Sequence, residues 1–325
     1  MKQSEYGSGY ADLTQSVDRA LELLKKGDMA EAQSEFLFIL QNHYDSSIAE
    51  FGIKVTKFWQ QRDKRIQNTS EGYDRGVLLL ELWPKFEEFY RTLRGIDDRI
   101  VSVLRYFVFT QALEQLNKDA NTSKRINAKM LYMVAMAYKK IGDYQNAMTA
   151  FEQLFCYDIN DSDVLAQLAD VYVLRGQSAY GKVLYREAFK DNPDGIHLEN
   201  IESDEFVHLT ELVRNEEPGI DERTLLYWIP VYGRIYHILN ISREMTPGDY
   251  MKLKKRTIAL ERELSQTLEY DSILTARLLN NYFLLYDYYR SQADEKVKRD
   301  EIENNIKKIA YNIYILFKKN DQEIR

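Results

Sequence analysis

The stretch MLYMVAMAYKKIGDYQNAMTAFEQLF, residues 130–155, decides the expected fold of this chain. Apolar residues recur in it at three- and four-residue spacing, which predicts two amphipathic helices. Gly142 lies between them, at a helix end where a left-handed backbone costs glycine least. If the same arrangement returns at a fixed distance, the chain is built from stacked pairs of helices.

A second copy of the pattern follows 34 residues later along the chain. The matching pairs are Leu131 with Leu165, Val134 with Leu168, Ala135 with Ala169, Tyr138 with Tyr172, Gly142 with Gly176, Ala147 with Gly181, Phe151 with Tyr185 and Ile159 with Pro193. We expect the small residues to let the two helices of a unit approach closely and the aromatic residues to fill the space between them. A weaker copy near the start has Gly27 at the turn, followed by Ala32 and Phe36.

This pattern resembles the tetratricopeptide repeat (TPR), a helix-turn-helix unit with the same period and the same order of small and aromatic positions. The resemblance implies an all-α fold, a TPR-like α-solenoid of helical hairpins with a C-terminal helical bundle or cap. The expected parts are a flexible leader (1–12), an atypical N-terminal TPR-like unit (13–46), degenerate helical hairpins (47–127), two clear TPR units (128–195), an acidic linker (196–221) and the C-terminal bundle or cap (222–325).

Several local features carry their own expectations. Pro84 should kink or start a helix rather than lie inside one, and Cys156 is expected to be a small buried apolar residue. Apolar positions nearly encircle RLLNNYFLLYDYY, so that helix should be buried between others. The long helices expected in the C-terminal part are 222–241, 249–268, 271–292 and 297–319.

The composition of the chain disfavours several classes of function. The 51 acidic and 44 basic residues are mixed along the chain and give a net charge of −7, which disfavours a nucleic-acid partner. No run of apolar residues is long enough to insert into a membrane, and the N-terminus lacks the apolar segment of a signal peptide. The expected location is the cytoplasm, or the periplasm if a leader has been removed. The chain has one cysteine and four histidines without metal-ligand spacing, so we expect no metal, no cofactor and no enzyme activity.

The TPR resemblance also implies a concave groove that binds a peptide or helix of another protein. The positions that face this groove in the family fall on Lys129, Tyr132, Met136 and Lys140 in the first clear unit, and on Asp163, Ala166, Gln167 and Asp170 in the second. The alternative is that a neighbouring helix or the C-terminal bundle already covers them. TPR domains that hold chaperone carboxylates carry Lys and Asn at set positions, where this chain has Tyr132, Met136 and Gln167, so that role is not expected.

The leading functional expectation is a non-catalytic scaffold or adaptor that assembles a larger complex. A second possibility is a ligand-responsive regulator whose superhelix binds a signal peptide. The combination of tyrosine-rich degenerate units with long extra helices is also similar to spirochaete TPR proteins, including components of the flagellar collar. A third class, an enzyme with its site in the C-terminal bundle, predicts clustered polar residues inside that bundle.

Overall fold

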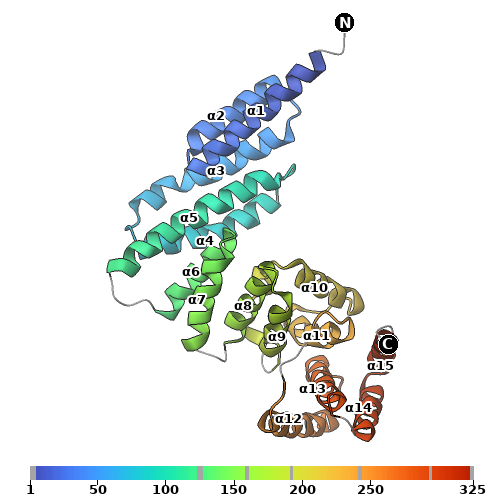
Figure 1. The fold of residues 1–325 in the computed structure, drawn as a ribbon. Helices are drawn as coiled ribbons and strands as arrows, with labels where there is room; N and C mark the ends of the chain where they lie inside the picture. Colours follow the sequence, from blue (N-terminus) through green and yellow to red (C-terminus); the bar gives the residue numbers. More distant parts are fainter. Residues whose placement is uncertain are drawn as a thin grey trace. The chain divides into compact units, whose positions relative to one another are not determined.

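The computed structural model describes residues 5–122, 127–157, 161–190, 193–240, 244–292 and 295–322. Within these ranges every regular element is a helix (Figure 1), which confirms the expected all-α class. The α-helices are α1 (Glu5–Lys26), α2 (Met29–Asn42), α3 (Ser47–Asn68), α4 (Tyr73–Arg91), α5 (Asp98–Thr122), α6 (Ala128–Lys140), α7 (Tyr144–Tyr157), α8 (Ser162–Leu174), α9 (Ser178–Ala188), α10 (Asp204–Glu216), α11 (Glu222–Ile235), α12 (Pro247–Gln266), α13 (Ser272–Arg290), α14 (Lys296–Ile309) and α15 (Tyr311–Gln322). Two short 3₁₀ helices, η1 (Pro193–Gly195) and η2 (Leu198–Asn200), lie between α9 and α10.

The chain divides into two compact units, unit 1 (Met1–Ala150) and unit 2 (Phe151–Arg325), and the division falls within α7. In unit 1, α2 packs against α1 and α3, and α5 packs against α4, α1 and α6. In unit 2, α8 pairs with α9, α10 with α11, and α13 packs against α11, α12 and α14. Helices that are consecutive in the sequence are therefore the usual packing partners within each unit.

The repeat positions explain how these hairpins form. Gly142 and Gly176 both have positive φ, +81° and +79°, and each ends the first helix of its pair as the sequence predicts. Gly181 of α9 lies so close to α8 that a Cβ atom there would be 2.7 Å from the carbonyl oxygen of Ala169. The small residues at these two positions therefore set the spacing between α8 and α9, as expected.

An aromatic cluster forms much of the core of unit 1. Trp59, Trp83 and Phe86 are almost fully buried, and the ring of Phe86 lies 5.3 Å from each of the two indole rings. Each such side chain contributes roughly 1.5–3 kcal/mol by leaving water. The expectation for Pro84 is wrong, because this residue lies inside α4 next to Trp83. Burial of its neighbours outweighs the roughly 3 kcal/mol that proline costs within a helix.

The core of unit 2 is centred on α11 and α13. Both helices bury residues around most of their circumference, which confirms that RLLNNYFLLYDYY lies between other helices. The helix expected at 297–319 is two helices, because Ala310 has the non-helical angles φ −144° and ψ 86°. The helix expected at 222–241 ends earlier, since His237 adopts a positive φ of 59° and turns the chain.

Several boundaries differ from the sequence expectations. The segment 196–221, expected to be an acidic linker, contains α10, whose Phe206, Leu209 and Val213 are buried in unit 2. Helix α1 begins at Glu5, inside the expected leader; residues 1–4 and Ile159 lie outside the described residues. The burial expected for Cys156 is wrong, because its side chain is exposed at the end of α7. None of the described helices combines the length and apolar character that a membrane crossing requires.

Candidate functional site

The predicted groove residues of the first clear repeat lie on α6, in unit 1. Asn127 caps this helix by accepting a hydrogen bond from the backbone N–H of Met130 at 2.8 Å. Lys129 is exposed, while Tyr132, Met136 and Lys140 are partly buried. Because Tyr132 and Met136 are four residues apart, their side chains lie on the same face of the helix.

The predicted groove residues of the second clear repeat lie on α8 and are buried in unit 2. Asp163 is 7% exposed, and both Gln167 and Asp170 are completely buried, as is Ala166. Three polar residues in a row on one helix stripe are costly to bury unless each has partners. Their partners are Tyr185 of α9 and the segment between η1 and α10, which lies within the stretch expected to be a linker.

Asp170 accepts three hydrogen bonds from these elements. Its Oδ1 atom accepts hydrogen bonds from the Tyr185 hydroxyl at 2.7 Å and from the backbone N–H of Ser203 at 2.9 Å. Its Oδ2 atom accepts from the backbone N–H of Glu202 at 2.8 Å. Burial raises the pKa of Tyr185 well above its ordinary value, and the neighbouring Asp170 carboxylate contributes to the shift. Tyr185 therefore stays a neutral hydrogen-bond donor.

Asp163 and Gln167 hold the same segment one turn earlier. Asp163 Oδ1 accepts from the backbone N–H of His197 at 2.9 Å, and Gln167 Nε2 donates to the His197 carbonyl at 3.4 Å. The expectation that Asp163, Gln167 and Asp170 face a partner is therefore wrong, because the chain's own residues cover α8. The i, i+4, i+7 spacing of three polar residues on an otherwise apolar helix is the signal that could have predicted this cover.

One hollow in unit 1 has a volume of about 390 Å³ and lies beside the α1–α2 turn, between α3 and α5. Trp59, Leu79 and Phe107 supply apolar walls, and Gln60 and Asp63 are among the polar residues of its lining. Gln60 Nε2 donates to the Met29 carbonyl at 2.9 Å, which ties α3 to the start of α2. This volume and mixture of walls are typical of sites for small ligands or single side chains.

The second hollow of unit 1 lies between α3 and α4 and has a volume of about 580 Å³. Its aromatic floor consists of Phe58 and Phe89, whose rings stack with centroids 5.0 Å apart. Four cationic side chains and one anionic side chain line it: Lys54, Lys57, Arg62, Lys85 and Glu88. The sequence interpretation missed this basic lining, although KVTKFWQQRDKR at 54–65 is rich in cations within an acidic chain.

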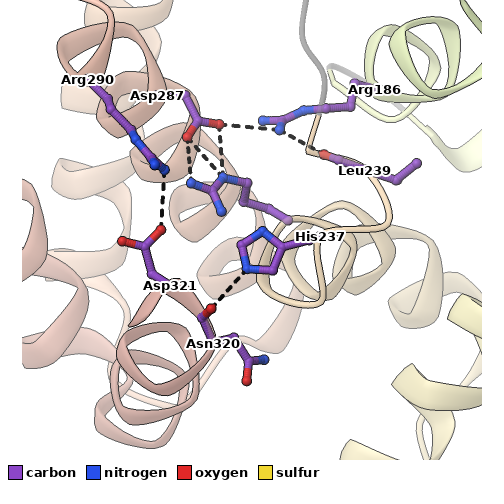
Figure 2. A network of polar contacts seen from close by, with 8 residues as sticks. Arg186, His237, Leu239, Asp287, Arg290, Asn320 and Asp321 are labelled. Carbon is purple, nitrogen blue, oxygen red and sulfur yellow. Dashed lines mark hydrogen bonds and ion pairs between the residues drawn. The ribbon is translucent and has the colours of Figure 1, made fainter. Parts of the chain in front are cut away.

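Unit 2 contains a buried network of charges, shown in Figure 2. The Asp287 carboxylate of α13 accepts from Arg234 of α11 at 2.8 to 3.0 Å and from Arg186 of α9 at 3.3 Å. Arg186 also donates to the Leu239 carbonyl at 2.9 Å. Both guanidinium side chains are at most 4% exposed, so one carboxylate joins three helices and leaves an excess positive charge.

Helix α15 is held next to this network by polar contacts. His237 Nε2 lies 3.2 Å from the Asn320 carbonyl, and Arg290 pairs with Asp321 at 3.3 Å (Figure 2). Asn320 in turn donates to the Ile235 carbonyl at 3.3 Å. The polar residues inside the C-terminal part thus hold helices together. Several charged groups that a catalytic site there would need are engaged in these contacts.

No protein-family model, no curated protein and no solved structure matches this chain. Among the described residues, no three His, Cys, Asp or Glu side chains are grouped in a way that could hold a metal ion.

Proposed function

We propose that this chain is a non-catalytic protein-interaction scaffold of TPR-like helical hairpins. In this proposal it binds a segment of a partner protein and assembles that partner into a larger complex. The internal repeat and the packing of consecutive helices support a solenoid-like interaction module, since such stacks bind partners along their helix faces.

The observation that carries the proposal is the contrast between the two units. In unit 2 the polar stripe of α8 is saturated by the chain's own backbone N–H groups at His197, Glu202 and Ser203. In unit 1, by contrast, two hollows with aromatic walls open to the surface, whereas a hollow of about 490 Å³ in unit 2 has no aromatic side chain in its lining. We therefore assign partner recognition to unit 1 and a rigid structural role to unit 2.

The face of α6 belongs to the same proposed recognition surface. Tyr132 and Met136 keep part of their surface exposed, and a flexible methionine beside an amphipathic tyrosine suits contact with a partner. Lys129, exposed one turn earlier, adds a cationic edge to this face.

The experiment is affinity capture of the tagged protein from a lysate of its native cells, with bound proteins identified by mass spectrometry. The variant Tyr132→Asp/Met136→Asp should lose a defined set of partners and keep its helical circular dichroism. The matched control is Tyr311→Asp/Ile315→Asp, which places the same charges at two exposed positions of α15. Loss of the same proteins from both variants, or capture of none, contradicts the proposal.

A regulator that binds a short signal peptide is the second candidate, and the 390 Å³ hollow favours it. Such a protein would bind a free peptide and become more compact, which small-angle X-ray scattering measures. A scaffold should instead keep its radius of gyration when a peptide of its partner is added.

A further inference from the structure

The hollow between α3 and α4 combines an apolar floor with a cationic rim. Phe58 is 5% exposed and Phe89 is partly exposed, so the rings form a recessed apolar surface. Lys54 and Lys57 approach it from α3, and Lys85 approaches it from α4. An apolar group placed on this floor would lie within reach of several ammonium groups at once.

The positive charge at this rim is not neutralised within the described part of the chain. Lys57 and Lys85 form no ion pair there, and the contact of Lys54 with Glu50 is a long one at 4.0 Å. Glu88 is the single carboxylate in the lining, against four cations. The hollow is thus locally cationic in a protein whose net charge is −7, and it attracts acidic groups over a distance of about one Debye length, roughly 8–10 Å.

Arg62 is held in position at the edge of this hollow. Its guanidinium carbon lies 3.4 Å from the centre of the Phe58 ring, and its Nη1 atom donates to the Phe58 carbonyl at 2.8 Å. Burial lowers the pKa of Arg62, and the positive charge of Arg65 lowers it further. A guanidinium fixed in this way loses little conformational entropy when it pairs with a carboxylate.

We propose that the α3–α4 hollow binds an acidic segment of a partner protein. An apolar side chain of that segment packs on the partly exposed Phe89, next to the Arg62 guanidinium that covers Phe58, and the carboxylates around it pair with the four cations of the rim. This inference rests on the proposed scaffold function and names the chemistry of its partner. It favours a protein over a nucleic acid, because Phe58 is recessed and covered by Arg62, which leaves no exposed aromatic platform for stacked bases.

The probe is a fluorescein-labelled peptide of glutamates around one central phenylalanine, and its binding is followed by fluorescence anisotropy. Lys57→Glu/Lys85→Glu should weaken binding at least about tenfold, since two rim charges become repulsive. Lys254→Glu/Lys255→Glu on α12 makes the same change of net charge at two exposed positions and should alter affinity less than about twofold. Lys57→Arg/Lys85→Arg should retain binding, and circular dichroism checks that each variant is folded.

Two further probes separate the contribution of the apolar contact to binding from that of the charges. Replacing the central phenylalanine with serine should weaken binding because the apolar floor loses its occupant, and added salt should weaken the original complex. The proposal is overturned if the acidic peptide does not bind, if both glutamate variants lose binding equally, or if the serine peptide binds as well as the original. Preferential binding of single-stranded oligodeoxythymidine, lost in Lys57→Glu/Lys85→Glu, would overturn it in favour of a nucleic-acid partner.

The capture experiment distinguishes this proposal from the scaffold function. If Lys57→Glu/Lys85→Glu retains the partners that Tyr132→Asp/Met136→Asp loses, the scaffold function is supported and the acidic-segment proposal fails. If the peptide binds as expected but no partner is captured from the lysate, the hollow is supported as an acidic-peptide site and the scaffold function fails.

Discussion

Replacing Asp287 with asparagine should lower the free energy of unfolding of unit 2 by about 3 kcal/mol. The substitution keeps the shape of the side chain but removes the carboxylate that pairs with both Arg186 and Arg234. Breaking a buried ion pair from one side typically costs 3–5 kcal/mol, because the remaining charge is left unpaired in the interior. The Asp287 side chain is 18% exposed, which places the expected loss at the lower end of that range.

Urea unfolding monitored by circular dichroism measures this decrease in the free energy of unfolding. Hydrogen exchange with mass spectrometry should show that the loss of protection lies in α11 and α13. Arg186→Met should cost less than Asp287→Asn, because Arg234 still pairs with the carboxylate through three short contacts. Asp194→Asn is the control, since it disrupts a pair with the exposed Arg223 and should cost no more than about 1 kcal/mol. A loss below about 1 kcal/mol for Asp287→Asn would refute the reasoning, because it would mean that water solvates both guanidinium groups.

Further predictions concern the repeats. Gly181→Ala should destabilise unit 2 by about 1–3 kcal/mol, because the new Cβ would lie 2.7 Å from the Ala169 carbonyl oxygen. Gly142→Ala should cost about 1–2 kcal/mol through its φ of +81° alone, since no atom lies within 4 Å of the new Cβ; urea unfolding measures both. The hydrogen bond to Glu152 raises the pKa of Tyr172 to about 12, and burial adds to the shift. The free energy of unfolding should therefore decrease as the pH rises from about 10, the ordinary tyrosine pKa, to about 12. The reason is that Tyr172 loses its proton at a lower pH in the unfolded chain than in the folded one. Tyr172→Phe should reduce that slope in pH-dependent urea unfolding, and an unchanged slope would contradict the assignment.

The repeat allowed much of the hairpin architecture to be predicted. The turns at Gly142 and Gly176 and the close approach at Ala169 and Gly181 depend on residues near one another in sequence. Local sterics fix these features, so a single sequence suffices. Pro84 shows the limit, because its place inside α4 depends on the burial of side chains such as Trp83 against other helices.

The candidate site was less predictable. The spacing placed Asp163, Gln167 and Asp170 on one face of a helix, and such a polar face can indicate a cover, but the spacing does not identify residues 196–203 as the cover. The hollow between α3 and α4 was missed for a related reason: its cations come from two helices, and the charge of each helix alone resembles an ordinary solvated surface.

By itself, the sequence determined the helical class, the period of the repeat and the residues at its turns and tight contacts. These properties follow from backbone conformation and from side-chain volume over one or two turns of helix. Only the tertiary structure decided which polar faces are covered and which remain open. That outcome depends on whether distant backbone N–H groups reach the Asp170 carboxylate, and on whether a cation such as Lys57 finds a partner within the fold.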